Sequence, residues 1–437
     1  MSQRPPVDLN GAPPPEDEAP PGWRQRTFAA LEDPFFRLLF IGNTLQFGSM
    51  QMQLVVRGWL VYDLTGSFAA LGTMALANAV PSLLLSPVGG VVADRAPKKT
   101  VIQLAQAYNA VNAAILAVLA AGWFGLDLEF WHLFLSSALQ GTVNSLMQPS
   151  RQSIISDLVP RDRLMNAVGI NASGQTLMQL IGPGAAGVMI ALVSPATVFW
   201  TMAAMYALAV SFTIRIPAHP LYAFTPPAGG QPAGGRRGPR GLRELVDGLR
   251  YVWDDRTIRM VMSVNFFIVL VAMPYTQLLP GFVESVLHRG PFELGVLQSV
   301  QGIGAVAGAL VLASAASRRR GQKYLWCGVL LGGSIVAFAV SQNFWITLPI
   351  MVLIGAGQAG RMALGQVLVQ TYAHEQYRGR VMAVWFMEFG LVQLGTFVVG
   401  VLAEFIGPQL AIGGLAATLV LAMGLIAATV PRMRALD

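Results

Sequence analysis

The sequence from residue 90 to residue 99 reads Gly90-Val-Val-Ala-Asp94-Arg95-Ala-Pro97-Lys98-Lys99, and it joins two long apolar segments. The segments lie near residues 67–92 and 100–122. Each is long enough to cross a hydrocarbon core of about 30 Å as a helix. The short stretch between them is basic, as loops on the cytoplasmic side of membrane proteins are. It therefore predicts a helical hairpin in a membrane.

Composition supports the same class of protein. The chain has 437 residues, of which 54% are hydrophobic and 12% charged, and its mean hydropathy is +0.55. Soluble domains carry about 25% charged residues, so a soluble chain of this length would lack its charged surface. The single cysteine, Cys327, excludes an intrachain disulfide framework and a multi-cysteine metal site.

The alternation of apolar segment and short loop continues in both directions. We expect an all-α membrane protein with twelve transmembrane helices in two pseudo-symmetric six-helix bundles. The N-terminal bundle, residues 31–216, has spans near 35–62, 67–92, 100–122, 130–157, 163–192 and 196–215. The C-terminal bundle, residues 257–437, has spans near 257–286, 292–316, 323–341, 344–371, 380–406 and 410–430.

Two polar regions flank the bundles. Residues 1–30 are rich in proline and acidic side chains, which predicts a disordered cytoplasmic tail. Residues 217–256 begin as a linker rich in proline, glycine and arginine. The linker ends in Leu242–Asp255, where apolar residues recur at helical spacing. This pattern predicts an amphipathic helix on the cytoplasmic membrane surface.

Basic residues orient the chain. They fall in alternate loops, and only Arg289 is a clear exception. Because positive charge stays on the cytoplasmic side, both termini are expected in the cytoplasm. This topology accounts for the net charge of +7 without a nucleic-acid partner. The loop residues are Arg95, Lys98, Lys99, Arg161, Arg163, Arg236, Arg237, Arg240, Arg243, Arg318, Arg319, Arg320, Lys323, Arg378, Arg380, Arg432 and Arg434.

The two predicted bundles share short sequence echoes. An Arg-x-Arg-apolar-Met pattern opens the fifth span at Arg161 and the eleventh at Arg378. Phe68-Ala-Ala-Leu-Gly72 opens the second span, and Phe292-Glu-Leu-Gly295 opens the eighth. Echoes at matching positions of two six-span sets indicate an internal duplication, which is common in secondary transporters.

The stretch from Gly90 to Lys99 resembles the signature loop of the major facilitator superfamily, G-x-x-x-D-R-x-G-[RK]-[RK], with Pro97 where the family usually has glycine. Span count, duplication and linker extend the resemblance over the whole chain. Trp59–Ser67 (WLVYDLTGS) and the Arg-x-Arg-apolar-Met segments resemble the bacterial branch that contains the enterobactin exporter and macrolide-efflux proteins. The resemblance implies alternating access in a bacterial cytoplasmic (inner) membrane.

It also implies gating residues. Asp94 is expected to accept hydrogen bonds from the start of the eleventh span and so to latch the halves, while Gly90 allows close helix approach. Arg95, Lys98 and Lys99 fit either this gate or membrane topology alone. Gly182-Pro183 in the fifth span resembles the antiporter motif of exporters, and the alternative is ordinary small-residue packing.

Charges inside a membrane span are costly and indicate function. Glu388 is our candidate for a carboxylate that binds the transported proton, and the alternative is a structural pair with an arginine. Arg361 and Arg151 could hold an anionic substrate group or pair with a carboxylate, and Arg151 could also reach the membrane interface. Arg57 is expected at the outer interface.

Spans one, four, seven and ten line the cavity in the resembled family. Their polar residues are therefore substrate-cavity candidates, with hydrogen bonding between helices as the alternative for each. Neutral polar groups among apolar ones suit a large amphipathic solute. With Arg151 and Arg361, the candidates are Asn43, Gln46, Gln140, Asn144, Asn265, Tyr275, Gln277 and Gln358.

The sequence has no nucleotide-binding P-loop, and no catalytic triad or metal-ligand cluster is visible. We therefore expect a transporter, not an enzyme, that acts as a monomer without a cofactor. The favoured function is proton-coupled efflux of a hydrophobic or amphipathic small molecule, such as a drug or siderophore. A lipid or lysolipid facilitator that needs no proton gradient is the first alternative, and a membrane sensor or scaffold without transport is the second.

Overall fold

The computed structural model describes residues 28–217, 219, 221–222, 240–314 and 318–437. Most of the predicted tail and the proline- and glycine-rich part of the linker lie outside these ranges. Within the described ranges the regular secondary structure is helical throughout, so the predicted all-α class is confirmed. The boundaries of tail, bundles and linker remain predictions.

The N-terminal half begins with a 3-10 turn, η1 (Ala29–Glu32), whose Ala30 amide donates to Asn166 Oδ1 at 2.9 Å. Local capping starts and ends its helices. Asp33 accepts hydrogen bonds from the amides of Phe35 and Phe36 at the start of α2, and Gly66 ends α2 in the left-handed conformation that glycine favours. The helices are α2 (Pro34–Thr65), α3 (Phe68–Arg95), α4 (Lys98–Ala120), α5 (Phe130–Ser153), α6 (Ile155–Leu158), α7 (Arg161–Leu192) and α8 (Pro195–Ile214), with a short turn η2 (Trp123–Gly125).

In the C-terminal half, two of the apolar spans are each broken into two helices. One break lies at Met273–Pro274 and the other at Phe386–Met387. Broken helices line the binding sites of many transporters, because they free backbone groups inside the membrane. The elements are α9 (Arg240–Asp254), α10 (Arg256–Ala272), α11 (Tyr275–Ser285), α12 (Pro291–Ser314), α13 (Arg320–Val340), α14 (Phe344–Tyr372), α15 (Arg378–Trp385), α16 (Glu388–Ile406), α17 (Pro408–Thr429) and α18 (Pro431–Arg434).

Ten spans in the described residues are long and apolar enough to cross a membrane, counting the two broken helices as one span each. The 32-residue α2 and the 24-residue α5 are long but do not reach the same hydropathy. Both carry glutamine, asparagine and arginine along their length. The count of twelve spans therefore remains a prediction.

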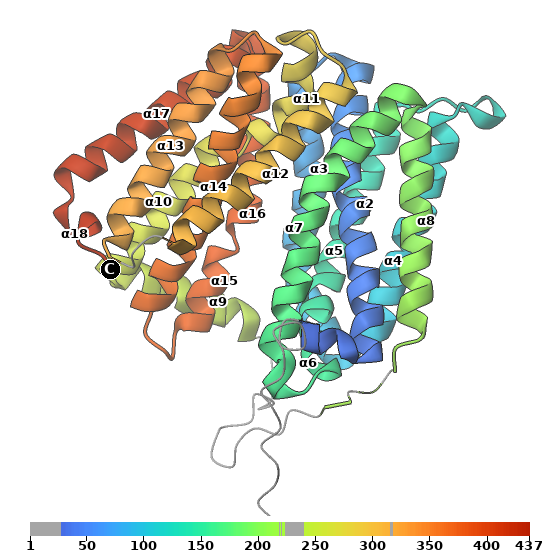
Figure 1. Ribbon diagram of the computed structural model, residues 1–437, viewed down its shortest axis with the longest axis horizontal. Helices are drawn as coiled ribbons and strands as arrows, with labels where there is room; N and C mark the ends of the chain where they lie inside the picture. The colour runs from blue at the N-terminus through green and yellow to red at the C-terminus, as the bar shows by residue number, and fades with distance from the viewer. Residues whose placement is uncertain (1–27, 218, 220, 223–239, 315–317) are drawn as a thin grey trace, which may run out of the picture.

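The packing of the two halves shows the duplication directly. In the N-terminal half α3 packs on α5, α4 on α8, and α2 on α7 and α8. In the C-terminal half α12 packs on α14, α13 on α17, and α10 on α16 and α17. Each pair in one list has its counterpart in the other, and Figure 1 shows the halves side by side. The predicted arrangement of two pseudo-symmetric helical halves is confirmed.

The halves meet along two helix pairs, α7 with α12 and α3 with α16. Glycines set both contacts. A Cβ on Gly187 would lie 2.5 Å from the carbonyl oxygen of Pro291, and a Cβ on Gly72 would lie 2.8 Å from Cα of Phe397. Gly295 and Gly72, which close the echoed segments of the sequence, thus lie at equivalent places in the two interfaces.

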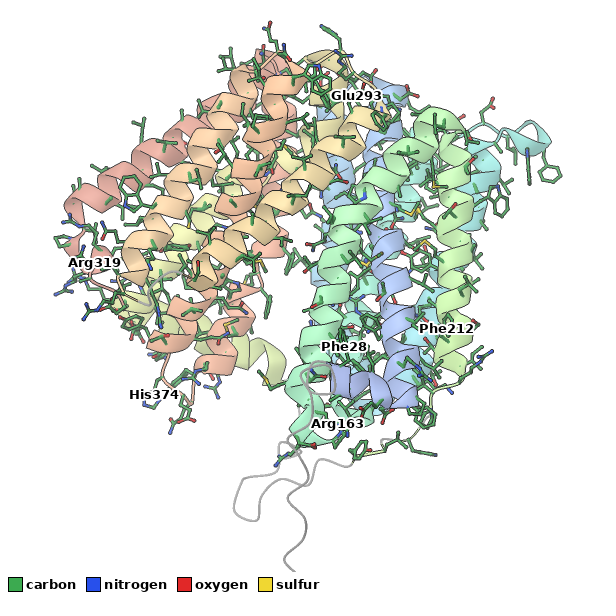
Figure 2. All side chains as sticks on the ribbon, viewed as in Figure 1. Phe28, Arg163, Phe212, Glu293, Arg319 and His374 are labelled. Carbon is green, nitrogen blue, oxygen red and sulfur yellow. The ribbon has the colours of Figure 1, made fainter. Side chains whose placement is uncertain are left out.

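The linker helix α9 docks on α15. The rings of Tyr251 and Tyr377 stack with centroids 4.5 Å apart. The amide of His374 donates to Tyr251 Oη at 3.1 Å, and Arg380 pairs with Asp247 at 3.6 Å. The predicted amphipathic helix is therefore present. It contacts α15, the first segment of the span that is broken between α15 and α16. Figure 2 shows that His374 and Arg163 lie toward the end of the bundle opposite Glu293.

Candidate transport site

A cavity of about 190 Å³ lies between the halves. Its polar lining comes mainly from α2, α3 and α5, while α11 and α16 of the other half contribute one glutamine each. The polar lining residues are Gln53, Arg57, Asn78, Ser137, Gln140, Asn144, Gln277 and Gln393, and the apolar ones include Met50, Leu54, Val61, Leu71 and Met74. Such a mixture of apolar side chains and a few polar groups is typical of small-molecule sites.

Three of the predicted cavity residues, Gln140, Asn144 and Gln277, line this space. Gln140 Nε2 donates to Gln53 Oε1 at 2.5 Å, which links α5 to α2. Sequence reasoning missed Gln53 and Ser137, although a signal for them exists. Gln53 and Arg57 are four residues apart, and Ser137 precedes Gln140 by three, so each pair shares one face of a helix.

Arg57 points into the protein, so its predicted place at the outer membrane interface is wrong. Its Nη1 donates to Ser137 Oγ at 3.1 Å and its Nη2 to Ser136 Oγ at 3.4 Å. Its Nε is buried without a partner. The two serines of α5 turn the guanidinium inward because they offer hydrogen-bond acceptors within reach of the long side chain.

A second polar cluster lies in the C-terminal half. It brings together three predicted site residues, Asn265 of α10, Arg361 of α14 and Glu388 of α16. Arg361 Nη1 lies 3.4 Å from Glu388 Oε2 and 2.5 Å from Asn265 Oδ1. Asn265 Nδ2 donates to Glu388 Oε2 at 3.1 Å. Tyr324, which the sequence did not single out, donates to Asn265 Oδ1 at 3.4 Å.

This cluster is a buried ion pair held by an amide. Arg361 is 3% exposed and Glu388 is 5% exposed, so each charge depends on the other for compensation. Glu388 is also the first residue of α16, directly after the break, where free amides favour a carboxylate. Because the members of this cluster come from three different helices, α10, α14 and α16, a relative movement of these helices would alter the pair.

Other cavity candidates form hydrogen bonds between helices, the alternative that the sequence left open. Asn43 Nδ2 donates to Asn171 Oδ1 at 3.0 Å. Gln46 accepts from Gln106 Nε2 at 3.0 Å, and Gln358 accepts from Gln301 Nε2 at 2.8 Å. These contacts join neighbouring helices and leave the three side chains outside the lining of the cavity.

The two remaining cavity candidates, Arg151 and Tyr275, are buried inside their own halves. The guanidinium of Arg151 lies 4.4 Å from the centroid of Phe47 and donates to Gln148 Oε1 at 2.8 Å. Tyr275 packs its ring on Phe338 with centroids 6.0 Å apart. Arg151 is 7% exposed, so its side chain does not reach toward the outside of the bundle.

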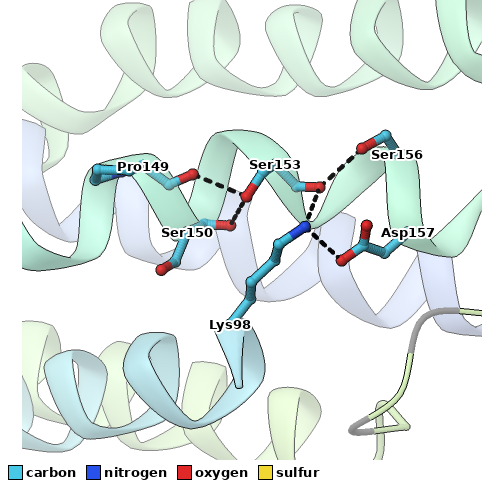
Figure 3. Close-up of polar contacts among 6 residues, drawn as sticks. All are labelled: Lys98, Pro149, Ser150, Ser153, Ser156 and Asp157. Atoms are coloured by element: carbon cyan, nitrogen blue, oxygen red, sulfur yellow. Dashed lines mark hydrogen bonds and ion pairs between the residues drawn. The ribbon is translucent and has the colours of Figure 1, made fainter. Parts of the chain in front are cut away.

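The predicted gating loop is only partly described. Lys98 Nζ pairs with Asp157 Oδ2 at 2.7 Å and also donates to the carbonyl of Ser153, so it ties α4 to the break between α5 and α6 (Figure 3). Lys99 donates to the carbonyl of Ile214 at 2.8 Å, and Arg95 is exposed. Gly90 and Asp94 lie in the last turns of α3, and their side-chain surroundings lie outside the described structure. The Asp94 latch therefore remains a prediction.

Gly182 and Pro183 lie in α7 at close contacts. A Cβ on Gly182 would lie 2.7 Å from Cβ of Gln51 in α2, and a Cβ on Gly295 would lie 2.6 Å from the carbonyl oxygen of Pro183. The segment therefore packs on its own half and on the partner half at once. The small-residue alternative describes this geometry, and any pivoting at Pro183 remains a prediction.

Glu404 makes a contact across the halves that sequence reasoning missed. Its Oε2 accepts hydrogen bonds from Ser67 Oγ at 3.1 Å and from the amides of Phe68 and Ala69 at 3.0 and 3.3 Å. A carboxylate from α16 thus caps the N-terminus of α3, where unpaired amides and the positive end of the helix dipole lie. Because Glu404 lies at the end of an apolar span, the sequence pattern does not distinguish it from an ordinary charged residue of a loop.

We expect Glu404→Ala to loosen this contact. The loss of a capping carboxylate costs about 1 kcal/mol, and hydrogen exchange at the Phe68 and Ala69 amides should accelerate about fivefold. Peptide-level hydrogen–deuterium exchange measures this effect. Glu293→Ala is the matched control, because Glu293 Oε2 accepts from the Gly290 amide within its own half. Unchanged exchange at residues 68–69 would contradict the assigned cap.

The described residues contain no group of three or more histidine, cysteine, aspartate or glutamate side chains that could hold a metal ion.

Two duplicated helical halves with a cavity of mixed polar and apolar lining between them define a transporter of the major facilitator fold. The crystal structure of the nucleoside transporter NupG has this fold and superposes with a TM-score of 0.71 at 15% identity, covering 90% of this chain and 98% of that one. Residues 25–437 match the family described as transmembrane secretion effector (MFS_3), and the chain belongs to that family.

Curated bacterial relatives cover most of the chain. The multidrug efflux pump Tap of Mycobacterium tuberculosis H37Rv is 26% identical over 417 residues, covering 92% of this chain and 95% of Tap. The staphyloferrin A transporter of Staphylococcus aureus is 24% identical over 370 residues, covering 85% of this chain and 88% of that protein. The chain is thus a multi-pass membrane transporter of the major facilitator superfamily and not an enzyme, and the predicted resemblance to bacterial exporters of this superfamily is confirmed.

Proposed function

We propose that this chain is a proton-coupled exporter of amphipathic small molecules, with Glu388 as the group that binds the proton. The observation that carries the proposal is the buried pair of Arg361 and Glu388 at the break between α15 and α16. The chain acts as a monomer in the bacterial cytoplasmic membrane with both termini in the cytoplasm. The proton gradient drives transport, and no cofactor takes part. Two of its relatives bear the names multidrug efflux pump and staphyloferrin A transporter.

The pair couples protonation to conformation because Arg361 and a proton compete for the carboxylate of Glu388. While Arg361 lies beside Glu388, its positive charge compensates the carboxylate and no proton is needed. A movement of α14 relative to α16 that withdraws Arg361 leaves a buried carboxylate without compensation, which favours the protonated acid. The return of Arg361 then displaces the proton. Alternating access that brings the site to each side in turn would move one proton for each cycle.

In the proposed orientation, the contacts of Glu404 with α3 and of Gly187 with α12 lie on the outer side of the membrane. The present conformation is then the one closed to the outside. Asp94, at the opposite end of α3, would act in the other conformation, where its side chain could cap the start of α15. The two ends of α3 would thus carry alternating latches.

Transport in everted membrane vesicles tests the proposal. The vesicles are energised to an acidic lumen and given a panel of cationic, neutral and anionic amphipathic dyes. We expect accumulation of at least one dye class, and collapse of the pH gradient by nigericin should abolish it. Flux that persists without the gradient would instead favour the lipid or lysolipid facilitator. The absence of any flux above vesicles that lack the protein would contradict transport of these solutes.

A further inference from the structure

The polar sites of the two halves differ in charge balance. In the C-terminal half, Arg361 has a carboxylate partner in Glu388. In the cavity, Arg57 has serine hydroxyls as its hydrogen-bond partners, and among the described residues no carboxylate lies within ion-pair distance of it. An arginine inside a membrane bundle is costly unless an opposite charge compensates it. A negatively charged solute in the cavity would supply the charge that compensates Arg57.

The cavity also contains a complementary orphan group. The buried Nε of Arg57 and the buried Oε1 of Gln393 both lack a hydrogen-bond partner, and both residues line the cavity. The guanidinium offers donors that suit an anion, whereas the amide oxygen of Gln393 requires an N–H or O–H donor. A solute that carries both kinds of group would satisfy both residues at once.

We propose that Arg57 binds a carboxylate of the transported solute, and that Gln393 accepts a hydrogen bond from an N–H or O–H group on the same molecule. One guanidinium balances one negative charge, and the other polar lining groups are neutral amides and a hydroxyl. A monocarboxylate therefore fits the site better than a doubly charged phosphate. The planar fork of arginine matches a carboxylate by two parallel hydrogen bonds. This inference rests on the proposed function and names its substrate class.

Binding to the purified full-length protein tests the inference without a proton gradient. The probes are benzoate, 1-naphthylacetate and 1-pyrenebutyrate, each compared with its methyl ester at neutral pH, where the acids are ionised. We expect the wild-type protein to bind at least one acid about tenfold or more tightly than its ester, since hydrogen bonds to a charged group contribute more than neutral ones.

Arg57→Gln should remove that preference, and its affinity for the ester should stay within about twofold of the wild-type value. Arg57→Lys retains the charge without the fork and should retain part of the preference. Arg289→Gln is the control, because Arg289 is exposed in a loop. If Arg57→Gln does not fold, the wild-type protein still tests the inference, since binding should fall as the pH is lowered through the pKa of the acid.

Three outcomes would overturn the inference. They are equal affinity of the wild-type protein for acids and esters, an equal loss of affinity for acid and ester in Arg57→Gln, and no saturable binding of any probe in the series.

Gln393→Leu should weaken the binding of a hydroxylated acid, 2-hydroxy-1-naphthylacetate, more than the binding of 1-naphthylacetate. A vesicle experiment that shows no gradient dependence would contradict the proposed proton coupling but would leave the binding result intact, so the two failures are distinguishable.

Discussion

Glu388→Gln should abolish accumulation driven by a pH gradient in everted vesicles, while exchange of labelled for unlabelled substrate without a gradient continues. Glutamine has the shape of glutamate and can still hydrogen-bond Asn265, but it cannot bind and release a proton. Its amide also provides no charge to compensate Arg361. Initial rates of accumulation with and without nigericin, compared with rates of exchange, measure the effect.

The same substitution should lower stability, because removal of one partner of a buried pair costs about 3–5 kcal/mol. The double variant Glu388→Gln/Arg361→Gln removes the orphaned charge and should recover part of the thermal stability but none of the gradient-driven accumulation. Glu375→Gln is the matched control, since Glu375 is exposed in the preceding loop. Undiminished gradient-driven accumulation by Glu388→Gln would leave Glu388 as a structural partner of Arg361 only.

Gly187→Leu should stop transport by preventing the closure of α7 on α12. A Cβ at this position would already lie 2.5 Å from the carbonyl oxygen of Pro291 and 3.0 Å from Cα of Gly295, and backbone atoms cannot rotate away. Overpacking of this kind costs about 1–3 kcal/mol or more. Because about 1.4 kcal/mol is a tenfold change in an equilibrium, the equilibrium between the forms closed and open along this interface should shift toward the open form by about fivefold or more.

Cysteine accessibility measures that shift. In a Cys327→Ser background, Ser299→Cys places a thiol on α12 facing Gly184, and its alkylation should accelerate when Gly187→Leu is added. Gly169→Leu is the matched control in the same helix, because a Cβ on Gly169 meets no atom within 4 Å. Equal alkylation rates and normal transport in both variants would show that this contact does not seal the protein.

Much of the fold was predictable because it depends on local hydropathy. A segment too apolar for water and long enough for a bilayer is expected to form a helix, since a helix pairs all of the backbone polar groups within the segment itself. Segments such as Pro408–Thr429 and Arg320–Val340 satisfy this condition directly. By contrast, α2 and α5 were predicted as spans although their polar side chains lower their hydropathy. The structure shows that several of those side chains, among them Gln46, Gln53 and Gln140, are buried inside the bundle.

The site was harder to predict, because it depends on distances between helices that are remote in sequence. Asn265, Arg361 and Glu388 were each selected as a polar residue in an apolar span. A pair between Glu388 and an arginine was left open as an alternative, but no pattern in the chain indicated which arginine is the partner or that Asn265 joins it. Arg57 was assigned to the outer membrane interface and Glu404 was not selected at all, because depth along a span does not reveal which way a long side chain turns. Both turn toward partners on another helix.

The Gly90–Lys99 stretch illustrates the difference between what the sequence alone determines and what the tertiary structure decides. By itself the sequence determined the class of protein, the duplication and the basic pattern of the loops, because hydropathy, length and charge are properties of single segments. Only the tertiary structure decided that Lys98 pairs with Asp157, that Arg361 neutralises Glu388 and that Arg57 lies in the cavity with no carboxylate partner among the described residues. Those outcomes depend on which faces of separate helices meet, and the low polarity inside the bundle makes each pairing matter energetically.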